Sequence, residues 1–315
     1  MAALGGSVLV ASPSAAEPSI SDVRAKVDRL DREAEEASER YNEAKSELAA
    51  AQKRLSALQA DLDREQESFD EVRSRVAATM VAQYQSHGIS TTGQVLSAED
   101  PDEFLSELQT VASYHARQGD VLAEFAVSAK QLELRQAATQ RELDAIAETE
   151  KQLAADKEQI DEKAAEAQKL LDKLEAEQRE RLLAASRGGP RVPLSDVPAT
   201  GRAKIAIKYA LAQVGDRYVY GATGPSAFDC SGLTMMAYAQ AGIGLPHSSS
   251  AQRGYGRSVA ASDLKPGDLV FYYSPISHVG IYLGNGMIVH AANPRAGVRV
   301  SPLYSMPYVG AVRLT

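Results

Sequence analysis

The amino-acid sequence predicts an α+β domain that follows a long antiparallel coiled-coil hairpin of α-helices. From residue 20 onward, apolar residues recur at alternating intervals of three and four, which is typical of coiled coils. A Pro- and Gly-rich segment at 187–200 lacks this period and is expected to be an extended linker. Beyond it, helical segments precede strand-like segments, which predicts an α+β domain over residues 201–315.

Residues 1–18 are mostly small and apolar, with Ser-Ala-Ala at 14–16. Such a string is typical of a cleavage site for secretion, so we predict a signal-peptide remnant or a disordered tail. The protein is therefore expected to be secreted into the cell-wall space, or a periplasm-like equivalent. No other stretch is apolar for long enough to span a bilayer, so we do not expect a transmembrane protein.

The predicted hairpin covers residues 19–186 and has an elaborated tip near 87–105. Its first apolar seam consists of Ile20, Val23, Val27, Leu30, Ala34, Ala37, Tyr41, Ala44, Leu48, Ala51, Leu55, Leu58, Leu62, Phe69, Val72 and Val76. A weaker second seam consists of Leu143, Ile146, Leu153, Ile160, Ala164, Ala167, Leu171 and Leu174. Between them, glycines at 88 and 93 break the helix and Pro101 follows a fresh N-cap signal. The apolar tip is expected to be either a small local core or a docking surface.

Charge is divided unevenly between the two halves. Residues 201–315 contain 10 Lys and Arg, 4 Asp and no Glu, whereas residues 1–200 contain 24 Lys and Arg and 38 Asp and Glu. The basic half suits an anionic substrate. It lacks basic clusters interleaved with aromatic residues, so nucleic-acid binding is not expected.

Cys230 is the single cysteine of the chain and stands where a nucleophile would be placed. It lies between the Gly/Pro-rich loop 221–225 and the apolar helical run 233–241. A helix N-terminus favours the thiolate, which is the reactive form. We therefore expect an ionised sulfur at the mouth of an accessible groove, in preference to a small buried hydrophobe.

Two histidines provide candidate partners for this thiol. His278 opens a strand whose Val279, Ile281 and Leu283 share one face, so the imidazole lies on the other face. The Gly-Asn-Gly turn at 284–286 reverses the chain and brings His290 beside His278. A thiol, a base and a group that orients the base constitute a catalytic triad. A zinc site made by Cys230, His278 and His290 is the alternative, but a fourth ligand and paired thiols are not visible, so no metal or other cofactor is expected.

The C-terminal half resembles the NlpC-type cell-wall peptidases of the papain-like superfamily. The strings that carry this resemblance are Arg-Tyr-Val-Tyr-Gly at 217–221, Phe-Asp-Cys-Ser-Gly-Leu at 228–233, Leu-Lys-Pro-Gly-Asp-Leu-Val-Phe-Tyr at 264–272, His-Val-Gly-Ile-Tyr-Leu-Gly at 278–284 and Val-His-Ala at 289–291. The resemblance implies a papain-like fold, Cys230 as nucleophile, His278 as base and acid, and His290 as the group that orients it.

The same resemblance implies substrate-binding residues. Tyr218 would position substrate or stabilise the oxyanion, and Asp229 and Ser231 would contact the free amino end of a peptidoglycan stem peptide. The bond most often cut in this family joins D-γ-glutamate to the following diamino acid. His247 stands where the family often has Arg, and Ala222 replaces a usual Gly, which bears on substrate preference but not on the triad.

The helical half resembles the coiled coils of division-associated murein hydrolases and their activators. Residues 80–84, 95–97 and 102–105 carry this similarity, which implies the extracellular part of FtsX, within an FtsEX complex, as a partner. Both halves together resemble actinobacterial RipC-type endopeptidases. The sequence thus predicts a secreted cysteine endopeptidase acting in cell separation under control of its coiled coil. The alternatives are an amidase or transpeptidase of the same fold, or a non-catalytic scaffold or activator of other hydrolases.

Overall fold

The computed structural model describes residues 19–85, 101–174, 176–187, 190 and 192–314. The chain forms two compact units, one made of Met1–Ser46 with Gln152–Thr315 and the other of Glu47–Lys151. The predicted signal remnant or tail at 1–18 lies outside the described residues, as does the predicted tip near 87–105 except for 101–105, which begin a helix.

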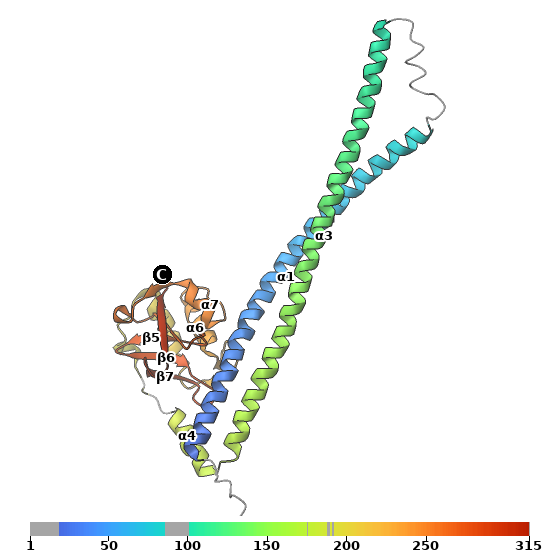
Figure 1. Cartoon of the computed structure of the whole chain (residues 1–315). Coiled ribbons are helices and arrows are strands. Elements are labelled where there is room, and N and C mark those ends of the chain that lie inside the picture. Colours follow the sequence, from blue (N-terminus) through green and yellow to red (C-terminus); the bar gives the residue numbers. More distant parts are fainter. Residues whose placement is uncertain (1–18, 86–100, 175, 188–189, 191, 315) are drawn as a thin grey trace, which may run out of the picture. The chain divides into compact units, whose positions relative to one another are not determined.

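Long helices run antiparallel in the first unit, as the hairpin prediction requires. Helix α1 is Ile20–Gln85, α3 is Pro101–Asp172 and α4 is Ala176–Arg187 (Figure 1). Within this unit the apolar seams form one buried cluster of Val23, Val27, Leu30, Ala167, Leu171 and Leu182. Ion pairs join Lys26 to Glu166 and Arg40 to Asp156. Residues later in α1 therefore pair with residues earlier in α3, as in an antiparallel hairpin.

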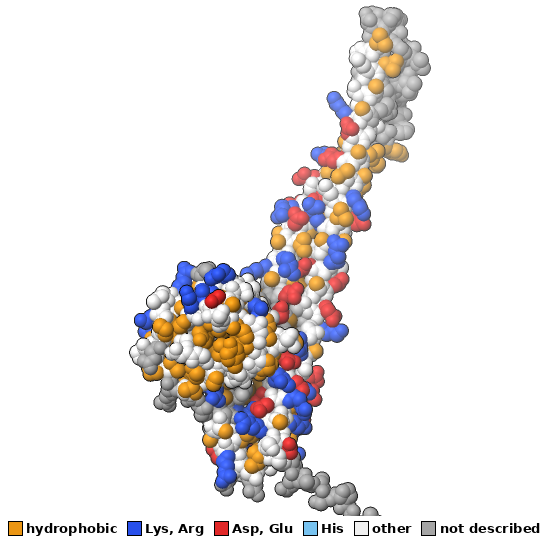
Figure 2. Space-filling view, turned by 60° about the vertical axis from the view of Figure 1, so that its left-hand side comes forward, with side chains coloured by type: hydrophobic (Ala, Val, Ile, Leu, Met, Phe, Trp, Pro, Cys, Tyr) orange, Lys and Arg blue, Asp and Glu red, His pale blue; other side chains and the backbone are white. Residues whose placement is uncertain are grey.

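The second unit repeats this pairing between the remaining parts of α1 and α3. The rings of Phe69 and Phe125 lie 5.3 Å apart. Glu65, which interrupts the apolar seam, pairs with Arg135 at 3.4 Å. Elsewhere, Figure 2 shows Asp, Glu, Lys and Arg side chains mixed along the exposed faces of the helices. No helix in the described part of the chain is long and apolar enough to cross a membrane.

The C-terminal domain combines helices with a six-stranded antiparallel sheet, which confirms the α+β prediction. Its helices are α5 (Gly201–Ala212), α6 (Cys230–Gln240) and α7 (Ser249–Gln252). The strand order is β3-β8-β4-β5-β6-β7. The strands are β3 (Arg257–Val259), β4 (Leu269–Tyr272), β5 (His278–Gly284), β6 (Met287–Ala291), β7 (Val298–Pro302) and β8 (Tyr308–Arg313). A separate parallel pair joins β1 (Arg217–Tyr218) to β2 (Ala227–Phe228).

Side chains alternate across the sheet and bury both of its faces. Val279, Ile281 and Leu283 of β5 point into the larger core, which also includes buried residues of α5 and α6. Tyr272 and Ile288 belong to the cluster on the other face. This alternation fixes where His278 and His290 emerge from the strands, and α6 brings Cys230 to the same end of the domain.

Candidate functional site

Cys230 is the first residue of α6, and a side-chain cap holds it there. Asp229 Oδ1 accepts a hydrogen bond from Gly232 N at 2.6 Å. A Cβ atom at Gly232 would lie 2.3 Å from the Ala222 carbonyl oxygen, so glycine lets α6 begin close to the preceding loop. The sequence therefore presents the sulfur at a closely packed helix start.

A chain of hydrogen bonds runs from His278 through His290 to Ser301. His278 Nε2 lies 2.7 Å from His290 Nδ1, and His290 Nε2 lies 2.9 Å from Ser301 Oγ. Burial, followed by the charges of His278 and Arg299, lowers the pKa of His290 well below its usual range. In a neutral His290 whose Nε2–H donates to Ser301, Nδ1 has no proton. Nδ1 of His290 then accepts a hydrogen bond from His278 Nε2–H. This arrangement leaves His278 Nδ1 to face the cleft.

Helix α1 places acidic side chains in that cleft, one on each successive turn. Asp31, Glu35 and Glu39 are spaced four residues apart, so they project from one helical face. All three are buried, although they lie beside the apolar seam and not within it. The face of α1 that they form packs on the C-terminal domain within the first unit.

Glu35 occupies the space beside the candidate base and nucleophile. Its Oε1 lies 2.6 Å from His278 Nδ1 and accepts a hydrogen bond from Tyr218 OH at 3.4 Å. Ligand atoms of Glu35, Cys230 and His278 all lie within 4.8 Å of one another. Among the described residues, these three form a group compact enough to hold a metal ion. The zinc site considered from the sequence used His290 in place of Glu35.

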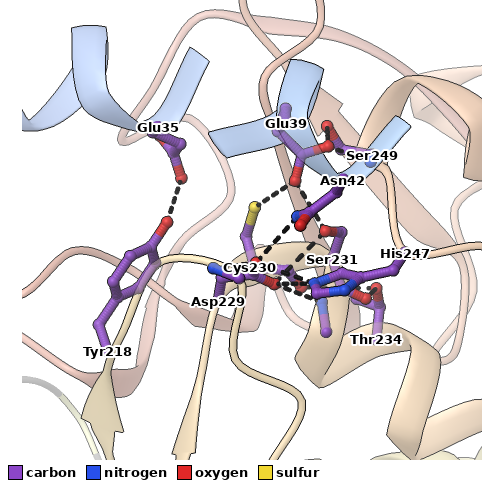
Figure 3. A network of polar contacts seen from close by, with 12 residues as sticks. Glu35, Glu39, Asn42, Tyr218, Asp229, Cys230, Ser231, Thr234, His247 and Ser249 are labelled. Carbon is purple, nitrogen blue, oxygen red and sulfur yellow. Dashed lines mark hydrogen bonds and ion pairs between the residues drawn. The ribbon is translucent and has the colours of Figure 1, made fainter. Parts of the chain in front are cut away.

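Glu39 covers the thiol from the next turn of α1. Its Oε1 accepts from Ser231 Oγ at 2.7 Å and lies 3.4 Å from Cys230 Sγ (Figure 3). Its Oε2 accepts from both the backbone N–H and the hydroxyl of Ser249, the latter at 2.8 Å. Burial, then the charge of Asp229, raises the pKa of Glu39 to about 7.

The state of Cys230 differs from the expectation of an accessible thiolate. The residue is 0% exposed: it belongs to the core of the C-terminal domain, and Glu39 of α1 lies against its sulfur. Burial, followed by the charges of Glu39, Glu35 and Asp229, raises the pKa of its thiol well above the usual range. The helix start favours the thiolate, but three nearby carboxylates and the loss of water outweigh it. The prediction of an ionised, open sulfur was wrong for this state of the molecule.

Asp229 and Ser231, predicted to contact substrate, lie beside the thiol but already have protein partners. Besides capping α6, Asp229 Oδ2 accepts from Gly221 N at 2.9 Å and from Asn42 Nδ2 at 3.1 Å. Nε2 of His247 lies 2.9 Å from both oxygens of Asp229. Burial lowers the pKa of His247, but its hydrogen bond to Asp229 and that carboxylate's charge outweigh this effect and raise it.

A cavity of about 420 Å³ lies beside this cluster, under the first turns of α1. It is lined in part by Tyr218, Tyr220, His290 and Arg295 of the C-terminal domain. Tyr220 OH donates to the Asp31 carbonyl oxygen at 3.2 Å, and Tyr218 and Tyr220 stack edge to face at 5.2 Å. Arg295 Nη2 donates to Asp31 Oδ2 at 3.0 Å.

Sequence reasoning missed Glu35, Glu39, Ser249 and Ser301. Charged residues beside a coiled-coil seam are ordinarily solvated, so Glu35 and Glu39 carried no distinguishing signal. Ser301 lies on a strand that pairs with β6, with Ser301 opposite Ile288, and its proximity to His290 depends on that register. His247 was noticed as a departure from the family pattern, but its contact with Asp229 could not be predicted.

Comparison with known proteins assigns the C-terminal domain to a family. Residues 215–312 match the model of the NlpC/P60 family. A probable endopeptidase of Corynebacterium glutamicum (strain R) is 44% identical over 124 residues, which cover 39% of this chain and 59% of that protein. A probable endopeptidase of Mycobacterium tuberculosis (strain H37Rv) is 47% identical over 119 residues, covering 38% of this chain and 31% of that protein.

A solved structure also aligns with this part of the chain. The crystal structure of the NlpC/p60 domain of the peptidoglycan hydrolase SagA aligns at 34% identity with a TM-score of 0.34. That alignment covers 36% of this chain and 98% of the SagA domain. The two bacterial relatives are matched over less than two thirds of their own lengths.

Proposed function

Because residues 215–312 form an NlpC/P60 domain, we propose that this chain is a cysteine endopeptidase that hydrolyses peptides of peptidoglycan. The observation that carries the proposal is that Cys230, at the start of a helix, lies beside His278. His278 is in turn hydrogen-bonded to His290, and His290 to Ser301. Thiol, base and orienting group are the parts that nucleophilic acyl transfer requires. The relatives named as probable endopeptidases support the same reaction class.

In the proposed reaction, His278 Nδ1 takes the proton of the Cys230 thiol. The sulfur then attacks the scissile carbonyl carbon, and the C–N bond breaks as His278 returns that proton to the leaving amine. A water molecule, deprotonated by His278, hydrolyses the thioester and restores the thiol. His290 orients His278, while Tyr218 OH and the Cys230 backbone N–H stabilise the oxyanion.

The proposed substrate is a stem peptide, cut between D-γ-glutamate and the diamino acid. Ser231 Oγ and the N–H and hydroxyl of Ser249 hold the Glu39 carboxylate, which supports recognition of a carboxylate-rich peptide by this cleft. Asp229 would meet the amino end of the peptide. We place the enzyme outside the membrane, in the cell-wall space, with a role in cell separation.

We further propose that α1 keeps the enzyme inactive until a membrane partner acts on the coiled coil. Glu35 and Glu39 fill positions that substrate must occupy to reach Cys230. The partner proposed is the extracellular domain of FtsX. Its docking would have to withdraw Asp31, Glu35 and Glu39 from the cleft, and the long arms of α1 and α3 suit such mechanical coupling.

Digestion of purified sacculi tests both proposals. A release variant, Asp31→Lys with Glu35→Lys, would place cations against Arg295 and His278 while leaving the apolar seam unchanged. Loss of two charge-assisted contacts predicts at least about a tenfold rise in solubilisation over the unmodified chain. Glu47→Gln, at an exposed carboxylate of α1, is the matched control and should leave the rate unchanged.

Mass analysis of the released muropeptides separates the alternatives. Cleavage at the glutamyl–diamino acid bond supports the endopeptidase, whereas release of whole stem peptides or new cross-links would indicate an amidase or a transpeptidase. Adding Cys230→Ala to the release variant should abolish the products. Full solubilisation by that chain would contradict a cysteine peptidase and support an activator of other hydrolases.

A further inference from the structure

Arg295 is a buried cation of the C-terminal domain that the proposed reaction does not use. It lies in the loop between β6 and β7, and its side chain is 5% exposed. It lines the cavity of about 420 Å³ that His290 and Tyr218 also line. A charged group so placed needs a partner of opposite charge, because burial without one is strongly unfavourable.

The acidic partners of Arg295 among the described residues come from α1. Its Nε and Nη2 donate to Asp31 Oδ2 at 3.1 and 3.0 Å, and Nη2 also donates to Asp28. Two acids of the C-terminal domain have partners elsewhere: Asp229 contacts His247, and Asp268 pairs with Arg313. When α1 withdraws, the guanidinium therefore loses the charges that now compensate it.

We propose that Arg295 is a substrate-binding residue that pairs with a carboxylate of the stem peptide, at the position Asp31 now occupies. This inference rests on the proposed function, since it requires a peptide substrate and the departure of α1. A guanidinium offers a planar fork that matches a carboxylate with two parallel hydrogen bonds. Tyr220 OH, which now donates to the Asp31 carbonyl oxygen, lines the same cavity as a further donor.

The spacing of the α1 acids indicates how far this carboxylate lies from the scissile bond. Asp31 precedes Glu35 by one helical turn, which is a rise of about 6 Å. Glu35 lies beside Cys230 and His278, whereas Glu39, one turn further, is held by Ser231 and Ser249. The Arg295 site thus lies two turns of α1 from the carboxylate site at Ser231 and Ser249, with Glu35 between them. A peptide with a carboxylate on each side of its scissile bond, as in D-γ-glutamyl-diaminopimelate, matches this arrangement.

The competing interpretation is that Arg295 acts solely as a latch for α1. Binding measurements on the full chain in the release background, with Cys230→Ala to prevent turnover, separate the two. Three peptides serve as probes: L-alanyl-D-γ-glutamyl-diaminopimelate, its glutamyl α-amide and its diaminopimelate side-chain amide. Titration calorimetry gives a Kd for each, with and without Arg295→Gln.

With Arg295 present, one of the two amidations should weaken binding about 10- to 100-fold, the size of a charge-assisted pair. Arg295→Gln should weaken binding of the free-acid peptide by a similar factor and abolish the effect of that same amidation, leaving the other intact. Arg295→Lys should restore part of the affinity, because it keeps the charge without the fork. Arg257→Gln, at an exposed cation on β3, should change nothing.

Three results would overturn the inference: unchanged affinity in Arg295→Gln, an equal loss for all three peptides, or no binding of any peptide to the release background. Loss of the proposed peptidase function is a separate outcome, because sacculus digestion by the Cys230-containing release variant reports it independently.

Discussion

Glu39 is a buried carboxylate that accepts hydrogen bonds from the hydroxyls of Ser231 and Ser249, the Ser249 backbone N–H and the Cys230 thiol. Burial, and then the charges of Glu39 and Glu35, raise the pKa of the Cys230 thiol, so the residues that block the cleft also suppress formation of the thiolate. Closure by α1 therefore both blocks access to the Cys230 thiol and disfavours its ionisation.

The pH dependence of closure follows from Glu39. In the closed state its pKa is raised to about 7 from an ordinary 4.5, so the closed state binds the proton more tightly than the released state does. This stabilisation is fully present below pH 4.5 and is lost as pH rises through 7. The titratable groups that interact with the charge of Glu39 include Asp229, Cys230 and His247.

We expect the ratio of the activity of the full chain to that of the release variant to rise from pH 4.5 to about pH 7. The division removes the pH dependence of catalysis itself. Burial also raises the pKa of Asp31, to about 6, in the closed state. Glu39→Gln should therefore reduce the rise of the ratio and leave only the part that Asp31 contributes. A ratio that falls with increasing pH in the unmodified chain would contradict the assigned role of Glu39.

Ser301 is expected to act as a positioning residue through His290. Ser301→Ala removes the partner of His290 Nε2, so in the release background kcat should fall about threefold to tenfold, with KM little changed. Ser301→Thr should retain most of the rate, and Ser258→Ala, at an exposed serine on β3, should retain all of it. An altered KM with unchanged kcat and pH profile would indicate that Ser301 does not support the base.

At the scale of elements, α1 is a helix with two buried faces. The apolar seam packs on α3 and α4 within the first unit, and the acidic face, offset from it by about one residue, packs on the C-terminal domain. The seam could be predicted because its period survives many heptads. The acidic face could not, because the same residues on an isolated hairpin would be solvated.

The start of α6 depends on close approach of the preceding loop. Gly232→Ala would press a methyl group against the Ala222 carbonyl oxygen and Asp229 Oδ1, at 2.3 and 2.8 Å. Overpacking of this kind costs about 1–3 kcal/mol, so the midpoint of urea unfolding should fall. Gly244→Ala, which meets nothing within 4 Å, serves as the control. Equal midpoints for both variants would show that the loop yields without penalty.

Much of the sheet could also be predicted from the sequence. The Gly-Asn-Gly turn and the alternation in β5 placed His278 and His290 on neighbouring strands, and the two imidazoles are hydrogen-bonded. The short strands β1, β2 and β3 were missed, because two or three residues give no period to detect. Burial of Cys230 was missed for a different reason: it arises from contact with a helix almost two hundred residues earlier in the chain.

For the whole molecule, the uneven division of charge now has a structural consequence. The acidic N-terminal half and the basic C-terminal half meet within the first unit, where Asp31 pairs with Arg295 and Glu35 contacts His278. Under the proposed regulation, a membrane partner that pulls on the coiled coil would separate these contacts. The proposed carboxylate-rich substrate would then replace the acids of α1.

Alkylation of Cys230 distinguishes a nucleophile that α1 shields from one that is accessible. The chain contains a single cysteine, so the mass added by iodoacetamide reports that sulfur alone. We predict slow labelling of the unmodified chain near neutral pH and labelling at least about tenfold faster in the release variant, because access to the thiol and its ionisation are both restored. Equal labelling rates, with both proteins folded, would contradict it.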